Sequence, residues 1–77
     1  MNMTKDYSFE YQLFDRLKMD CDYFLGYGGR DEKHLWAGSV EAQIAKMREL
    51  YDVLPEKPEW LTEQDIDRYY NAMSGLM

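Results

Sequence analysis

The sequence predicts an all-α fold, a compact three-helix domain with a Gly-rich first connection and a Pro-rich second connection. Three segments repeat apolar residues at the 3.6-residue spacing of an amphipathic helix. No segment alternates apolar and polar residues as a half-buried strand does. A chain of 77 residues is long enough for one domain only. We therefore interpret residues 1–77 as a single small helical domain, and we expect fraying at 1–7 and 74–77.

The first helix is expected over residues 8–25. Its apolar residues fall on one stripe, which consists of Leu13, Phe14, Leu17, Cys21, Phe24 and Leu25. Glu10 lies in line with this stripe, in the first turn, where a carboxylate favours the helix dipole. Gly26 follows at a position where many helices end. Residues 26–30 form the Gly-rich connection, in which several positions can adopt positive φ.

The second helix is expected over residues 40–53. Ser39 is a suitable N-cap, and Glu41 lies in the first turn. The apolar stripe consists of Val40, Ile44, Met47, Tyr51 and Leu54, and the opposite side carries Glu41, Ala45, Glu49 and Asp52. Pro55 ends the helix, because proline has no N–H to donate and disfavours helical geometry in the residue before it.

The third helix has the clearest local signal. Thr62 is the expected N-cap, and Asp65 lies where Glu or Gln would complete a capping box, so this is a near match. Leu61 and Ile66 are placed as a hydrophobic staple. The apolar stripe consists of Ile66, Tyr69, Tyr70 and Met73. We expect the helix to fray after Ser74.

The two connections differ in what their residues predict. Residues 31–36 favour one helical turn capped by Asp31 and followed by an extended segment, although a wholly extended path stays open. Residues 55–60 are expected to be extended and stiff, because two prolines fix φ. Trp36 and Trp60 lie in or beside these connections. We expect both to fold over the helix junction as lids, because the core is small.

The net charge of −6 belongs to one segment of the sequence. Residues 49–67 contain seven acids and one base, Lys57, whereas the eight acids and eight bases elsewhere cancel. The simplest interpretation is a solvated face that keeps a small protein in solution. The alternative is an acidic patch that docks on a basic partner. The residues predicted to bind such a partner are Glu49, Asp52, Glu56, Glu59 and Glu63.

A second candidate surface lies on the first helix, on the side that the apolar stripe does not use. Met19 and Tyr23 are four residues apart there, and Gln12 and Arg16 extend the same side. Met, Tyr and Arg are enriched at protein interfaces. The alternative is a set of scattered apolar side chains that needs no special explanation.

Composition excludes several classes of function. No apolar run approaches the roughly 18 residues of a membrane span, and the first residues do not resemble a signal peptide. A single Cys cannot form an internal disulfide and fits a reducing cytosol. The acidic balance disfavours nucleic-acid binding, which needs clustered bases. The weak basic patch that remains consists of Arg16, Lys18, Arg30 and Lys33, beside Tyr23 and Tyr27.

Catalytic and metal chemistry is poorly represented. A calcium loop that starts at Asp20 would have Phe24 and Leu25 where it needs an oxygen ligand and glycine. The glycines of residues 26–30 follow a helix, whereas a phosphate cradle precedes one. Cys21 lies within the core stripe, where a thiol is inert, so a dyad with His34 is not expected. One Cys and one His cannot hold zinc within one chain. We assign no catalytic, cofactor-binding or metal residue.

Three runs of the sequence resemble one of the large polyvalent protein-associated domains. They are residues 32–38 (Glu-Lys-His-Leu-Trp-Ala-Gly), residues 43–47 (Gln-Ile-Ala-Lys-Met), and residues 55–62 (Pro-Glu-Lys-Pro-Glu-Trp-Leu-Thr) with 65–66 (Asp-Ile). Such domains are encoded on phages, plasmids and conjugative elements of gut Firmicutes. The resemblance implies a mobile-element setting and a bacterial cytoplasm. It supplies neither a mechanism nor functional residues.

Together these observations predict a small, acidic, non-enzymatic protein-interaction module that needs no cofactor. It would bind and modulate a basic, nucleic-acid-handling partner, for example as an anti-CRISPR or other anti-defence inhibitor. The second hypothesis is a structural helical domain that self-associates, with a homodimer as its simplest form. The third is a weak nucleic-acid-binding module.

Overall fold

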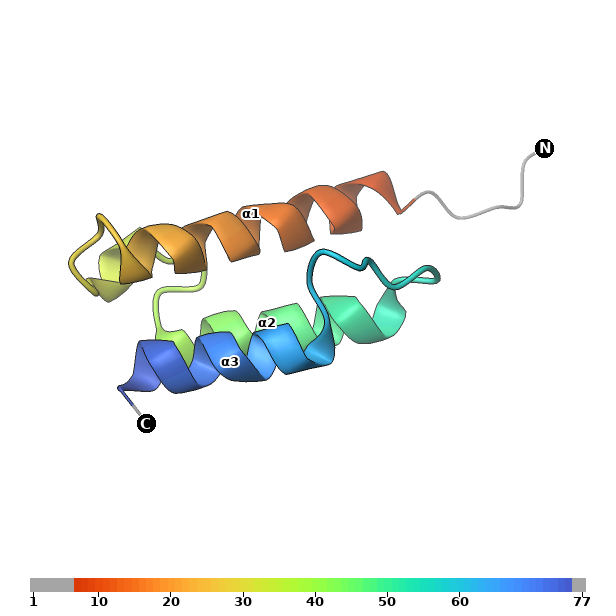
Figure 1. Cartoon of the computed structure of the whole chain (residues 1–77). Helices are drawn as coiled ribbons and strands as arrows, with labels where there is room; N and C mark the ends of the chain where they lie inside the picture. The colour runs from red at the N-terminus through yellow and green to blue at the C-terminus, as the bar shows by residue number, and fades with distance from the viewer. Residues whose placement is uncertain (1–6, 76–77) are drawn as a thin grey trace.

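Three α-helices and one short 3-10 helix make up the computed structural model, which describes residues 7–75 and has no strand within them. The elements are α1 (Ser8–Leu25), η1 (Glu32–His34), α2 (Val40–Val53) and α3 (Glu63–Ser74). Helices α2 and α3 lie side by side, and α1 runs lengthwise along the pair with a small tilt (Figure 1). The predicted all-α fold is confirmed, and the three predicted helices have the bounds that periodicity and caps indicated.

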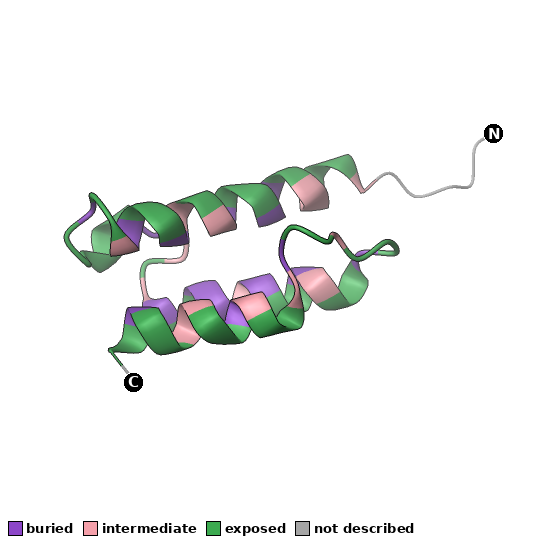
Figure 2. Cartoon of the chain, in the orientation of Figure 1, coloured by how far each residue is buried: buried purple, intermediate pink, exposed green. Residues whose placement is uncertain are grey.

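The core lies between α1 and the α2–α3 pair, and the side of α1 that faces away from them is exposed (Figure 2). Its buried apolar residues are Leu13, Phe14, Leu17, Cys21, Phe24, Leu35, Val40, Ile44, Met47, Leu50, Leu54, Leu61, Ile66 and Met73. The predicted stripes are thus largely confirmed. Leu25, Tyr51, Tyr69 and Tyr70 are only partly buried against this core. Leu50 and Gln43, which the predicted stripe of α2 left out, are buried.

The helix ends follow local sequence signals with two corrections. Ser39 caps α2 by accepting from the Ala42 N–H at 3.1 Å. Thr62 and Asp65 form a complete reciprocal capping box on α3, so Asp65 serves where Glu or Gln was thought necessary. Gly26, the C-cap of α1, has a negative φ of −99°, so the chain does not adopt the left-handed conformation directly after the helix. The positive φ values fall later, at Gly29 (65°) and Arg30 (60°).

The first connection folds back onto the end of α1. The Gly28 N–H donates to the Tyr23 carbonyl at 2.6 Å, and the Arg30 N–H donates to the Phe24 carbonyl at 3.0 Å. A Cβ at Gly28 would lie 3.0 Å from the Tyr23 ring, so glycine permits this close approach. The ambiguity over residues 31–36 is resolved as one 3-10 turn, which Asp31 caps by accepting from the Lys33 N–H at 3.0 Å.

The second connection is held to α1 and to the end of α2. The Tyr11 hydroxyl donates to the Glu56 carbonyl at 2.8 Å and accepts from the Glu56 N–H at 3.3 Å. The Lys57 ammonium donates to the carbonyls of Tyr51, Asp52 and Leu54 at the end of α2. A cation is favourable there because the carbonyl end of a helix carries partial negative charge. Both contacts fix the path of the chain between α2 and α3.

The two tryptophans cover the core less than predicted. Trp36 and Trp60 are 47% and 46% exposed. The Trp60 ring packs on Phe14 with 5.6 Å between ring centroids. Phe14 is fully buried, whereas about half of the Trp60 side chain that packs on it stays exposed. The prediction that both tryptophans fold over the helix junction is therefore confirmed in part for Trp60 and was wrong for Trp36, which lines a hollow on α1.

The fraying predicted at 1–7 and 74–77 falls mostly outside the described residues. Within them, Tyr7 is the N-cap of α1 and packs against the core. At the other end, Ser74 is the last residue of α3, and Gly75 closes the helix with a left-handed φ of 79°.

Candidate functional site

The acidic residues predicted to bind a partner are all exposed. They lie on the last turns of α2, on the second connection and at the first residue of α3: Glu49 and Asp52, Glu56 and Glu59, and Glu63, respectively. The Tyr11 and Lys57 contacts hold the connection between these helices, so its carboxylates project from a fixed backbone.

Internal ion pairs neutralise only part of this acidic segment. Glu49 pairs with Lys46 at 3.1 Å, and Asp67 pairs with Arg48 of α2 at 2.8 Å. Asp65 pairs with Arg68. The carboxylates that have no cationic partner within residues 7–75 are Asp52, Glu56, Glu59 and Glu63. Lys57, the one base of the segment, is used at the end of α2. Within residues 49–67, the uncompensated charge is therefore concentrated in residues 52–63.

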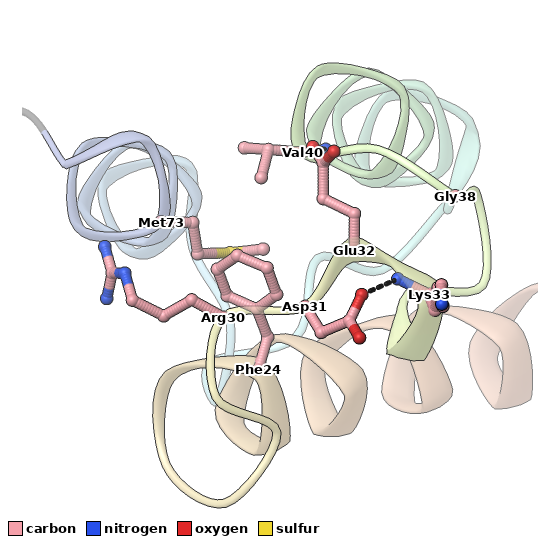
Figure 3. A pocket seen from close by; sticks show the side chains of 8 residues that line it. All are labelled: Phe24, Arg30, Asp31, Glu32, Lys33, Gly38, Val40 and Met73. Atoms are coloured by element: carbon pink, nitrogen blue, oxygen red, sulfur yellow. Dashed lines mark hydrogen bonds between the residues drawn. The ribbon is translucent and has the colours of Figure 1, made fainter.

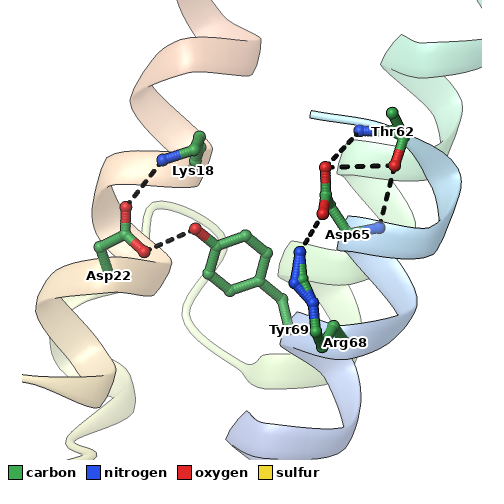
Figure 4. Close-up of polar contacts among 6 residues, drawn as sticks. All are labelled: Lys18, Asp22, Thr62, Asp65, Arg68 and Tyr69. Atoms are coloured by element: carbon green, nitrogen blue, oxygen red, sulfur yellow. Dashed lines mark hydrogen bonds and ion pairs between the residues drawn. The ribbon is translucent and has the colours of Figure 1, made fainter. Parts of the chain in front are cut away.

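Asp65 has a structural role that separates it from these four carboxylates. It accepts from the Thr62 N–H at 2.9 Å and from Arg68 (Figure 4). These bonds, the backbone bond first, hold the pKa of the Asp65 carboxyl below its usual value. Its charge is therefore part of the α3 cap and is not free for a partner.

The predicted face of α1 is exposed along its whole length, and it includes one residue that sequence reasoning missed. Met19 and Tyr23 are 59% and 46% exposed, and Gln12 and Arg16 are exposed between them and the start of the helix. Phe9, at 67% exposure, extends the same side. Phe9 lies seven residues, or two helical turns, before Arg16, and this spacing could have placed it on the same side of the helix. We call Phe9, Gln12, Arg16, Met19 and Tyr23 the α1 outer face.

One edge of the α1 outer face carries aromatic side chains from the first connection. Trp36 and Phe9 line a shallow hollow of about 320 Å³ together with Gln12, Leu13 and Arg16. The Trp36 N–H donates to the Asp20 carboxylate at 3.0 Å, which fixes this segment against α1. Further along, the His34 ring meets the Tyr23 ring edge-on, with 5.1 Å between centroids. This edge therefore presents aromatic rings to solvent.

The other edge of the α1 outer face meets α3 through a polar contact. Asp22 accepts from the Tyr69 hydroxyl at 2.5 Å and from the Lys18 ammonium at 3.0 Å (Figure 4). Burial, and then the bond to Asp22, raise the pKa of Tyr69 to about 12. The bond to Asp22 likewise raises the pKa of Lys18. The three groups join α1 to α3 without leaving a reactive group free.

Removing the Tyr69 hydroxyl should weaken this contact in a pH-dependent way. Tyr69→Phe is expected to cost about 1 kcal/mol of unfolding free energy at pH 7, the net value of a hydrogen bond. The folded-state pKa of Tyr69 is raised, so the contribution is complete below the unfolded pKa of about 10 and disappears as the pH rises through 12. Urea unfolding of both proteins at pH 7 and at pH 11 measures the difference.

Tyr70→Phe is the matched control, because the Tyr70 hydroxyl makes no hydrogen bond within residues 7–75 although its ring is partly buried. Its unfolding free energy should match that of the original chain at both pH values. A Tyr69→Phe deficit that persists unchanged at pH 11 would contradict the assigned hydrogen bond.

A larger hollow, of about 680 Å³, opens between the end of α1, η1, the start of α2 and the end of α3 (Figure 3). Its polar side chains hold the backbone in place. Arg30 donates to the Ala72 carbonyl, Glu32 accepts from the Val40 N–H at 2.8 Å, and Asp31 caps η1. Of the groups that line it, only Lys33 has a charged end without an ion pair or side-chain hydrogen bond within residues 7–75. We see no converging set of ligands there.

The basic residues of the third hypothesis are mostly engaged. Arg16 pairs with Asp20, Lys18 pairs with Asp22, and Arg30 bonds the end of α3. Of the four, Lys33 alone has neither an ion pair nor a side-chain hydrogen bond within residues 7–75. Their charges are thus committed to folding, which weakens the case for a nucleic-acid surface.

The candidate thiol and imidazole lie in different environments. Cys21 is buried, and its thiol donates to the Met47 sulfur at 3.7 Å. Burial raises the pKa of the Cys21 thiol to about 12. His34 is exposed on η1, against the Tyr23 ring. Within residues 7–75, no group of three His, Cys, Asp or Glu side chains is arranged to hold a metal ion.

Comparison with known proteins gives one match. A family model described as large polyvalent protein-associated domain 11 matches residues 7–73. No curated protein and no solved structure matches the chain. None of the helices in the described part of the chain has both the length and the apolar character to cross a membrane.

Proposed function

The chain belongs to the large polyvalent protein-associated domain 11 family, and we propose that it is a small, non-enzymatic protein-interaction module. It binds and modulates a basic, nucleic-acid-handling partner in the bacterial cytoplasm. Its setting is a mobile element such as a phage or plasmid. An anti-CRISPR or other anti-defence inhibitor is the concrete form that we favour.

The observation that carries this proposal is the set of four carboxylates in residues 52–63 without an internal cation. An exposed anionic surface attracts a basic groove over long range and sets the orientation of the encounter. A site that binds nucleic acid is lined with Lys and Arg that contact phosphates. Carboxylates on a fixed backbone can occupy such a site in place of phosphates and so block it.

The non-enzymatic part of the proposal is supported by the state of the reactive groups. A thiol with a pKa near 12 is not a nucleophile at neutral pH. The exposed His34 has no carboxylate hydrogen-bonded to it within residues 7–75, so nothing orients its ring as a general base. The exposed carboxylates of residues 52–63 and the α1 outer face are therefore the features that we assign to function.

The test measures binding and inhibition across a panel of purified host nucleases and Cas effectors. We expect the chain to bind a member of this panel and to reduce its nucleic-acid binding or cleavage. Changing Glu56, Glu59 and Glu63 together to Gln should lower the affinity about tenfold or more and flatten its salt dependence. Changing the same three residues to Asp keeps the charge and is the matched control, with affinity expected near that of the original chain.

Two outcomes would overturn the proposal. One is that no member of the panel binds. The other is that the Gln triple variant binds and inhibits as well as the original chain, which would remove the acidic segment from the interface.

A further inference from the structure

We propose that the α1 outer face docks an amphipathic, cationic α-helix of the partner. This inference rests on the proposed function and names the element that the partner supplies. It concerns a different surface from the acidic carboxylates of residues 52–63, so the two can be tested separately.

The spacing of the exposed residues is that of a helix-packing seam. Phe9, Gln12, Arg16, Met19 and Tyr23 alternate steps of three and four residues, which is the a and d spacing of a heptad. From Phe9 to Tyr23, at the rise of an α-helix, the seam is about 21 Å long. Both ends of the seam are apolar, and Gln12 and Arg16 form a polar middle. A partner helix is the element that matches a straight seam of this kind.

The charge along the seam indicates the sign of that helix. Asp15 is exposed and has no cation within residues 7–75. Asp22 follows seven residues later on the same edge, and its side chain is half exposed. Asp22 already accepts from Lys18 and Tyr69, so a Lys or Arg residue on the flank of a docked helix would pair with Asp15. The opposite edge offers the rings of Trp36 and His34 and the hollow beside Phe9, which can receive one large apolar side chain.

A second copy of the chain fits this seam less well. A parallel pair would place Arg16 against its own equivalent and Asp15 next to Asp20 of the other copy. An antiparallel pair would align the edge of Asp15 and Asp22 with the same edge of the other copy. Both arrangements bring like charges together, and each chain carries a net charge of −6. Charge complementarity therefore favours a basic partner helix over self-association.

The probe is a synthetic three-heptad peptide with Leu at positions a and d and Lys at positions e and g. A peptide with Glu in place of Lys reverses the charge, and a scrambled peptide of the same composition as the Lys peptide removes the seam. Calorimetry gives the affinities, and backbone amide chemical shifts of the labelled full-length chain locate the contact. We expect saturable binding of the Lys peptide only, with the largest shift changes on α1 and at Trp36.

Matched variants of the chain separate docking from simple charge attraction. Met19→Lys places a cation in the seam and should weaken binding of the Lys peptide about tenfold or more. Ala45→Lys adds the same charge on the exposed side of α2 and should change the affinity less than twofold. Circular dichroism of both variants should match that of the original chain, because both positions are exposed.

Three outcomes would overturn the inference. The scrambled peptide could bind as well as the Lys peptide, or the shift changes could concentrate on residues 52–63; either result reduces the contact to general attraction. The chain alone could be a dimer in light scattering that Met19→Lys dissociates, which would make a second copy the occupant. These results concern the α1 outer face only. The role of the acidic segment is tested separately, by comparing the Gln triple variant with the original chain across the panel.

Discussion

Replacing Phe14 with alanine is expected to leave the domain only marginally stable, with a free energy of unfolding of about 0–2 kcal/mol at room temperature. Phe14 is fully buried, and its ring contacts Tyr51 at the end of α2 and Trp60 in the second connection. A Phe→Ala change in a core costs about 3–5 kcal/mol. A domain of this size has a total stability of roughly 5 kcal/mol. The loss therefore removes most or all of the free energy of unfolding.

The measurement is the far-ultraviolet circular dichroism signal with a urea titration. The matched control is Phe9→Ala, which removes the same side chain from the exposed side of the same helix. That control should change the free energy of unfolding by less than about 0.5 kcal/mol. A cooperative transition of Phe14→Ala within about 1 kcal/mol of the original chain would show that the core tolerates the cavity and that the packing around Phe14 is not as described.

The helices could be read from the sequence because their signals are local. Apolar periodicity, the Ser39 and Thr62 caps and the stop at Pro55 each act within a few residues of the chain. Tertiary contacts did not need to override them, and the predicted bounds were confirmed. The same locality explains the errors. How far Trp36 and Trp60 are covered depends on how the helices pack against one another, which no local signal specifies.

The candidate surfaces could be predicted only in part, for a related reason. Exposure of the acidic residues and of the α1 outer face followed from helix periodicity. The sequence did not indicate which carboxylates lack an ion-pair partner. Arg48 of α2, for example, pairs with Asp67 of α3, which is 19 residues away in sequence. Phe9 was left out because it precedes the core stripe, although its heptad spacing to Arg16 was visible in the sequence.

Gln43 is the residue for which sequence reasoning failed most clearly. It was not placed in the core, because glutamine is rarely buried, yet it is fully buried. Its side-chain carbonyl accepts from the Ala37 N–H at 2.9 Å, and its amide donates to the Leu17 carbonyl at 3.2 Å. It thereby ties the approach to α2 onto the middle of α1. Only the assembled fold brings these two backbone groups within reach of one side chain.

Changing Gln43 to Glu should therefore destabilise the protein strongly at neutral pH and much less at acidic pH. The variant has the same shape, but its carboxylate would face the Leu17 carbonyl with no proton to donate. An uncompensated buried charge costs about 3 kcal/mol or more. Burial raises the pKa of such a carboxyl in the folded state. The protonated side chain of the Gln43→Glu variant can donate to the Leu17 carbonyl. The stability that this contact gives is fully present below the unfolded pKa of about 4.3 and is lost as the pH rises through the folded pKa.

Urea unfolding of the original chain and of Gln43→Glu across a pH series measures this difference directly, because the other titrating groups are common to both. Gln12→Glu makes the same change on the exposed side of α1 and should shift the free energy of unfolding by less than about 0.5 kcal/mol at any pH. A Gln43→Glu deficit that is small at pH 7, or that does not shrink on acidification, would mean that the side chain does not bridge Leu17 and Ala37. The tie between α1 and the start of α2 would then have to come from apolar packing alone.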